Sequence, residues 1–138
     1  MGAHKGKVVT RFAKMWPRDV FNIRNGKRLL VEIQERLSET GVYILYRDDH
    51  PYYVGKATNC LYDRIWAHAN RPKDRYYNFW NFFSAFVIPD KRHIDEVEGI
   101  LIASMPTDNS SVLRIKKIYL PVKIASFIRS QRIIQLEK

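Results

Sequence analysis

The sequence is short of cysteine and of long hydrophobic runs, and each shortage excludes a class of protein. Cys60 is the only cysteine among 138 residues, so no disulfide can form within the chain, which favours a reducing compartment such as the cytoplasm. The sequence has no Cys/His cluster of the kind that holds structural zinc. No apolar run approaches the roughly 18 residues of a membrane helix, and residues 1–7 lack the apolar core of a signal peptide. We therefore expect an intracellular, single-domain protein without membrane contact.

Acidic residues are also few, and the resulting positive charge is unevenly distributed. The chain has 14 Asp and Glu against 24 Lys and Arg, a formal net charge of +10. The net charge is +5 over residues 1–40 and +6 over residues 110–138, but −1 over residues 41–109. The two ends could therefore bind a polyanion such as DNA and present it to the middle segment. Basic residues that merely solvate helices are the alternative, but a charge of this size favours nucleic acid. The candidate DNA-binding residues are Lys27, Arg28, Lys116, Lys117, Arg129 and Arg132.

The spacing of apolar residues predicts a small α/β domain in which helices flank a short, mainly antiparallel sheet of three strands. The first two strands are expected to pair as a hairpin, because a polar stretch separates them. A helix that Thr58 or Asn59 could cap is expected to end at Asn70. The other expected elements are strands over 42–46, 52–55 and 80–88, helices over 26–38, 91–105 and 124–136, and an extended segment over 112–122.

Charge and pattern together divide the chain into three parts. Residues 1–40 are expected to form a basic, helical N-terminal extension, and residues 41–109 a catalytic core. Residues 110–138 are expected to form a basic C-terminal extension that packs on this core.

Two short strings of tyrosine and glycine lie in the nearly neutral middle segment. Gly41-Val42-Tyr43 lies in the first strand-like run, and Tyr53-Val54-Gly55 lies in the second and is followed directly by Lys56. Arg64 and His68 come four residues apart on the next helix, so their side chains point to the same side.

Glu98 lies on a later helix, beside the apolar residues Val97 and Leu101, which places it at the rim of the buried face. Two tyrosines, a lysine, an arginine, a histidine and one carboxylate are the residue types that metal-assisted cleavage of a phosphodiester can use.

Each of these residues also has a structural interpretation. Either tyrosine could pack in a core, and the glycines could be turn residues. Arg64 and His68 could form an exposed helix face, and Glu98 could belong to a solvated acidic face with Asp95 and Glu96. The spacing of the whole set, rather than any one residue, favours the functional interpretation.

The set as a whole resembles the GIY-YIG nucleases. The two strings match the two signature strings of that family, with valine in place of isoleucine in both. The resemblance extends over about residues 41–109, and the Arg64–His68 spacing is similar to that in many restriction and homing members. The remaining matches are Glu98 to the metal-binding glutamate, and Pro106 and Asn109 to the end of the motif set.

The resemblance implies hydrolysis of DNA with one divalent cation, Mg²⁺ or Mn²⁺. It assigns Glu98 to the metal and Tyr43 to the base, while Arg64 would bind a phosphate oxygen bidentately. Tyr53 would orient the water or the phosphate, and Lys56, His68 or the metal would make deprotonation of Tyr43 easier. Whether His68 takes the proton itself or relays it stays open. Gly41, Gly55 and Asn109 are expected to support the site.

Three interpretations of the whole chain follow from the sequence. The first is a metal-dependent DNA endonuclease with a role in restriction, homing, repair or phage biology. The second is a nucleic-acid-binding module of the same fold that does not cut. The third is a structural protein whose tyrosines and phenylalanines only fill a core. The sequence leaves open whether the protein is a monomer or a homodimer.

Overall fold

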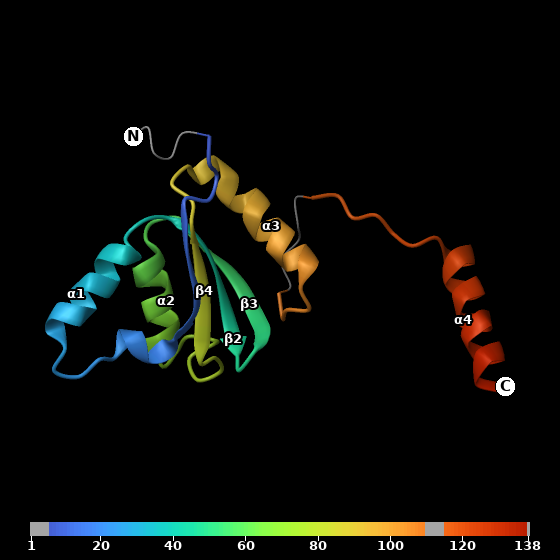
Figure 1. Ribbon diagram of the computed structural model, residues 1–138, viewed down its shortest axis with the longest axis horizontal. Coiled ribbons are helices and arrows are strands. Elements are labelled where there is room, and N and C mark those ends of the chain that lie inside the picture. Colours follow the sequence, from blue (N-terminus) through green and yellow to red (C-terminus); the bar gives the residue numbers. More distant parts are fainter. Residues whose placement is uncertain (1–5, 110–114, 138) are drawn as a thin grey trace.

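The computed structural model describes residues 6–109 and 115–137, which form a small α/β fold with an antiparallel sheet (Figure 1). The expected helices and the three expected strands are all present. None of the helices described is long and apolar enough to cross a membrane. The elements are β1 (Arg11–Pro17), η2 (Arg18–Phe21), α1 (Lys27–Arg36), β2 (Gly41–Arg47), β3 (His50–Ala57), α2 (Leu61–Asn70), β4 (Phe82–Val87), η3 (Lys91–His93), α3 (Ile94–Ser104) and α4 (Val122–Glu137).

The sheet has four strands rather than three, in the order β1-β4-β2-β3. The additional strand, β1, comes from the part of the chain that we expected to be helical, and it pairs with β4 through Phe12 and Phe86. A bulge between Ala13 and Trp16 breaks the alternation of the strand, and Met15 has a φ of 52°. An edge strand with such a bulge lacks the period-two pattern by which strands are predicted, which is why the sequence did not indicate it.

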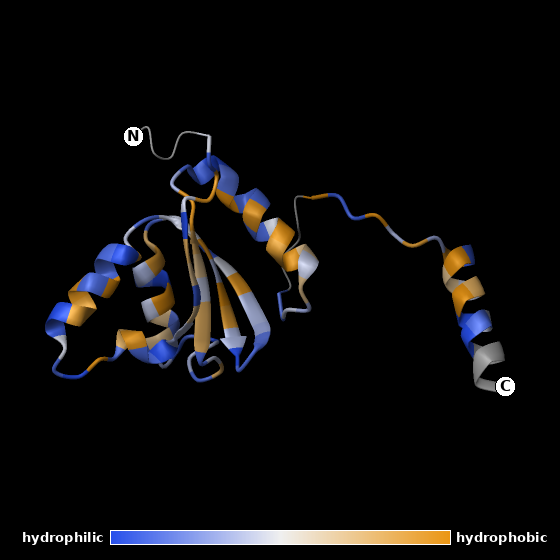
Figure 2. Cartoon of the chain, viewed as in Figure 1, coloured by the Kyte–Doolittle hydropathy of each residue, from blue (hydrophilic) through white to orange (hydrophobic). Residues whose placement is uncertain are grey.

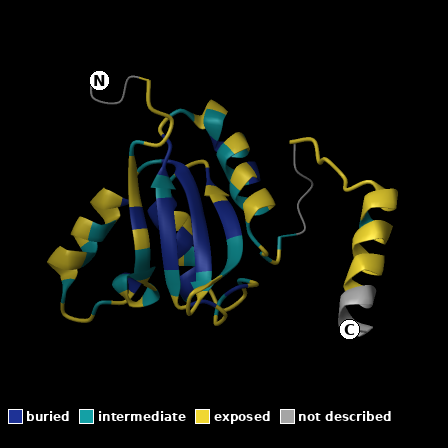
Figure 3. Ribbon diagram, turned by 45° about the vertical axis from the view of Figure 1, so that its right-hand side comes forward, coloured by how far each residue is buried: buried dark blue, intermediate teal, exposed yellow. Residues whose placement is uncertain are grey.

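Helices cover the two faces of the sheet. On one face, α2 and the end of α1 pack on a large cluster that includes Tyr43, Leu45 and Phe83. On the other face, α3 packs on a smaller cluster around Ile44 and Val54. Figure 2 shows hydrophobic residues along the strands and in α3, and Figure 3 shows that the central strands are buried. The edge strand β3 therefore lies between a helix on each face, and the tyrosine strings of the candidate site lie on β2 and β3.

The C-terminal helix α4 lies apart from the sheet in Figure 1. We expected this segment to pack on the core. In the structure, the side chains described for α4 are exposed, apart from the half-buried Ala125, and they include the apolar Ile124 and Phe127. Packing of α4 on the core is therefore not seen in the part of the helix whose side chains the structure describes. The division of the chain at residues 40 and 110 stays a prediction.

Candidate active site

The pairing of β2 with β3 brings the two tyrosine strings together. Tyr43 lies opposite Gly55, and Tyr53 lies opposite Leu45, so both tyrosines are on the α2 face of the sheet. Their ring centroids are 6.3 Å apart. A Cβ atom at position 55 would overlap the ring and hydroxyl of Tyr43, so only glycine fits beneath this tyrosine.

Gly41 has a different reason to be glycine. A Cβ at this position would overlap the backbone carbonyl oxygen of Phe86 on β4. Gly41 therefore allows β2 and β4 to approach closely at the start of the strand that carries Tyr43.

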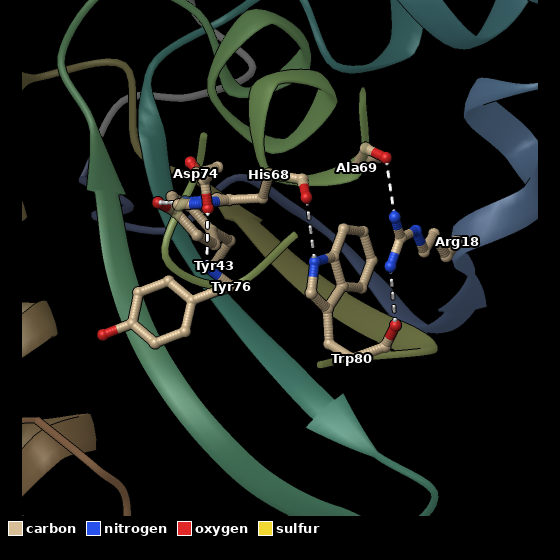
Figure 4. Close-up of polar contacts among 7 residues, drawn as sticks. All are labelled: Arg18, Tyr43, His68, Ala69, Asp74, Tyr76 and Trp80. Carbon is tan, nitrogen blue, oxygen red and sulfur yellow. Dashed lines mark hydrogen bonds and ion pairs between the residues drawn. The ribbon is translucent and has the colours of Figure 1, made fainter. Parts of the chain in front are cut away.

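Helix α2 places His68 in hydrogen-bond contact with Tyr43. The Tyr43 Oη and His68 Nε2 atoms are 2.7 Å apart, and the two residues are 0% and 3% exposed (Figure 4). The end of α2 is held from two sides, because Trp80 Nε1 donates to the His68 carbonyl and Arg18 donates to the Ala69 carbonyl. The N-terminal segment that contains Arg18 thus helps to position α2.

The beginning of α2 differs from the prediction. Cys60, rather than Thr58 or Asn59, occupies the N-cap position, and no side chain caps the helix there. The helix nevertheless ends at Asn70 as expected, so Arg64 and His68 share one side of it.

The loop after α2 completes the surroundings of His68 with two residues that the sequence analysis missed. Asp74 Oδ1 is 2.8 Å from His68 Nδ1 and accepts a hydrogen bond from the backbone N–H of Tyr76. The Tyr76 ring stacks on that of Tyr53, with centroids 4.3 Å apart. Both missed residues lie in an irregular loop, where periodicity gives no signal. The only sequence clue was a carboxylate six residues after His68, just beyond the helix.

Burial controls the protonation of this group of side chains. Burial and the neighbouring Tyr53 raise the pKa of the Tyr43 hydroxyl, and the Arg64 guanidinium opposes this increase only in part. Burial also raises the pKa of Tyr53. Burial lowers the pKa of His68, although Asp74 acts in the opposite direction. The resting site near neutral pH therefore contains neutral tyrosines and a neutral histidine beside a permanently charged arginine.

Glu98 and Lys56 lie on the α3 side of β3. The ammonium of Lys56 donates to Asp95 Oδ1 at 2.6 Å. Glu98 is half-buried, and burial raises the pKa of its carboxyl group, with Lys56 acting against the increase and Asp95 adding to it. Lys56 is thus placed to act on the Glu98 carboxylate rather than on Tyr43, which lies on the opposite face. The Glu98 charge also raises the pKa of Tyr53, so the two sides of the site are electrostatically coupled at the edge of the sheet.

Among the predicted site residues, Glu98 is the one carboxylate that could hold a cation. Residues 6–109 and 115–137 contain no group of three or more His, Cys, Asp or Glu side chains arranged to bind a metal. A divalent cation at Glu98 would need oxygen ligands from water and from a bound phosphate. The carboxylate fits such a cation, because burial disfavours its charge and a nearby positive ion would compensate for that.

Asn109 lies along the free edge of β3. Its side-chain amide accepts a hydrogen bond from the Val54 N–H at 3.0 Å and donates one to the Val54 carbonyl at 2.8 Å. Asn109 therefore fastens the chain that follows α3 to the strand of the second tyrosine string.

The predicted DNA-binding residues belong to separate parts of the structure. Lys27 and Arg28 are exposed at the start of α1, and Figure 1 shows α1 and α4 on opposite sides of the sheet. Their function stays a prediction. The four predicted residues of the C-terminal part, Lys116, Lys117, Arg129 and Arg132, are also exposed.

In comparisons with known proteins, residues 39–106 match the family described as the GIY-YIG catalytic domain. Comparison with curated proteins gives no match. Similar solved structures include three point mutants of the GIY-YIG N-terminal endonuclease domain of UvrC from Thermotoga maritima, each bound to its catalytic divalent cation. One is 24% identical and the other two are 22% identical; each match has a TM-score of 0.49 and covers 62% of this chain and 98% of that domain. The family match includes both tyrosine strings, α2 and Glu98. Residues 39–106 of this chain therefore form a GIY-YIG domain, the catalytic unit of a family of nucleases.

Proposed function

We propose that this chain is a divalent-metal-dependent endonuclease that hydrolyses phosphodiester bonds of DNA. The observation that carries the proposal is the 2.7 Å contact between Tyr43 Oη and His68 Nε2 within a GIY-YIG domain. Any buried tyrosine hydroxyl needs a hydrogen-bond partner, but an imidazole nitrogen is a partner that can also take up the proton, as a reacting tyrosine requires. The basic ends of the chain, at net +5 and +6, supply the attraction for a polyanion.

Arg64 would bind the scissile phosphate. It lies on α2 four residues before His68, and its charge lowers the pKa of both Tyr43 and Tyr53, which places the guanidinium near both hydroxyls. A guanidinium can contact two phosphate oxygens at once, and it stays ionised throughout the reaction. Glu98 would hold the cation, Mg²⁺ or Mn²⁺, which when bound supplies positive charge near the phosphate and the leaving oxygen.

Tyr43 and His68 would activate the attacking water together. As the water oxygen forms its bond to phosphorus, a proton of the water passes to Tyr43 Oη and the Tyr43 proton passes to His68 Nε2. The bond from phosphorus to the leaving oxygen breaks, and that oxygen keeps the electron pair and takes a proton from solvent. This route avoids a free phenolate, which the buried environment of Tyr43 disfavours. Tyr53, stacked on Tyr76, would orient the water or the phosphate.

The direct test is incubation of supercoiled plasmid DNA with the full chain in Mg²⁺, in Mn²⁺ and in EDTA. Nicked or linear DNA should form with either metal and not in EDTA. DNA binding without cleavage in either metal would contradict the proposal and identify a binding module of the same fold. The absence of both binding and cleavage would favour the structural interpretation.

A further inference from the structure

Asp74 contacts one ring nitrogen of His68, Nδ1, while Tyr43 contacts the other, Nε2. Figure 4 draws the three side chains together. The side chains of His68 and Asp74 are 4% and 18% exposed. An ionised carboxylate only accepts hydrogen bonds, so His68 Nδ1 must carry the ring proton that Asp74 Oδ1 receives. A neutral imidazole has only one such proton. Its Nε2 is therefore unprotonated and accepts the hydroxyl proton of Tyr43.

We propose that Asp74 is a positioning residue of the nuclease reaction. It fixes His68 in the tautomer whose Nε2 can accept the Tyr43 proton, and it stabilises the imidazolium that this transfer creates. The inference rests on the proposed function and adds to it the step that lets a buried histidine act as the final proton acceptor. A carboxylate that orients a histidine beside a hydroxyl is a known solution to the same chemical problem.

The other groups around His68 do not share this effect. Arg64 on α2 lowers the pKa of His68, as burial does, and only Asp74 raises it. Tyr43 and Tyr53 approach the ring from the sheet, and Tyr76 approaches it from the loop after α2. Asp74 is thus the group that favours the charged ring during the reaction.

The test separates the charge of Asp74 from its hydrogen bonds. In Asp74→Asn, the amide oxygen can still accept from His68 Nδ1 and from the Tyr76 N–H, but the negative charge is removed. We expect single-turnover plasmid cleavage to fall about 10- to 100-fold, with unchanged DNA affinity. The wild-type rate should decline at low pH as His68 becomes protonated, and in Asp74→Asn this decline should move to lower pH. Asp74→Ala, which also removes the acceptor, should cut more slowly still.

Asp49→Asn is the matched control, because the Asp49 side chain in the hairpin turn is 91% exposed and should leave the rate and its pH profile unchanged. Nitrogen-15 NMR of the His68 ring, assigned with His68→Gln, adds a measurement that needs no active variant. It should show the proton on Nδ1 in the wild-type protein. A proton on Nε2, or an Asp74→Asn enzyme with the wild-type rate and pH profile, would overturn the role of Asp74. Failure of the wild-type protein to cut DNA would instead contradict the proposed function.

Discussion

Gly55 and Tyr43 lie opposite each other on two paired strands, and the Tyr43 ring occupies the space that a side chain at position 55 would need. Tyr43 on β2 lies over Gly55 on β3, and a Cβ at position 55 would overlap the phenol ring and its hydroxyl. The glycine of the second string is thus required by the tyrosine of the first. This relationship explains why the two strings occur together on neighbouring strands.

Gly55→Ala adds only one methyl group, but we expect it to lower both stability and cleavage activity. The added methyl group must displace the Tyr43 ring, because Tyr43 is fully buried and a Cβ at position 55 overlaps its ring. We expect a decrease of about 1–3 kcal/mol in unfolding free energy, typical of an overpacked core, and loss of most cleavage activity. Denaturant unfolding and plasmid nicking measure the two effects. Thr58→Ala, an exposed change three residues away, is the control. A fully active Gly55→Ala enzyme would show that the position of Tyr43 is not critical.

Glu98→Gln tests the metal assignment. The amide keeps the shape of the side chain but loses the charge that would hold a cation. We expect DNA binding to persist and cleavage in Mg²⁺ or Mn²⁺ to fall to the level seen in EDTA. Glu96→Gln is the matched control, because Glu96 lies on the same helix and is exposed. Near-normal cleavage by Glu98→Gln would exclude Glu98 as the metal ligand, and Asp95 would then be the next residue to test.

Arg64→Lys tests the proposed phosphate contact. Lysine keeps the positive charge but cannot make two parallel hydrogen bonds to a phosphate. The arginine would act on charge that develops in the transition state, so the single-turnover rate should fall by about 10²-fold or more while DNA affinity changes little. Arg71→Lys, an exposed position just after α2, should cut normally. If Arg64→Lys also cuts normally, Arg64 is only a surface charge.

The two tyrosines can be tested by removing one hydroxyl at a time. Tyr43→Phe leaves His68 Nε2 without its donor, which should lower the unfolding free energy by about 1–2 kcal/mol. The protein should still fold, but cleavage should be abolished. Tyr53→Phe should leave stability nearly unchanged and should also impair cleavage, because the orienting hydroxyl is absent. Circular dichroism and plasmid nicking distinguish these outcomes, and full activity of either variant would make that tyrosine a structural residue.

The sequence predicts the parts of this structure that depend on regular spacing. The hairpin of β2 and β3, the shared side of Arg64 and His68 on α2 and the position of Glu98 on α3 all follow from periodicity. What the sequence does not predict depends on irregular backbone. The bulge in β1 hides the fourth strand, and the loop after α2 hides Asp74, whose contact with His68 depends on how that loop turns back. A periodic pattern carries no information about such loops.

The basic ends of the chain lead to the last prediction, which concerns salt. If Lys116, Lys117, Arg129 and Arg132 bind the DNA backbone, changing all four to glutamine should weaken binding and flatten its dependence on salt. The dependence should fall by about one power of salt concentration for each phosphate that is no longer neutralised. These side chains are exposed and no apolar residue changes, so the melting temperature should stay the same.

The control removes the same amount of charge elsewhere, by comparing pairs of substitutions. Lys116→Gln with Lys117→Gln is compared with Lys91→Gln and Arg92→Gln, which remove two exposed charges from the nearly neutral middle segment. Only the first pair should change the salt slope. An unchanged slope in the fourfold variant would place the DNA elsewhere, and the same measurement on Lys27→Gln with Arg28→Gln would then test the N-terminal segment.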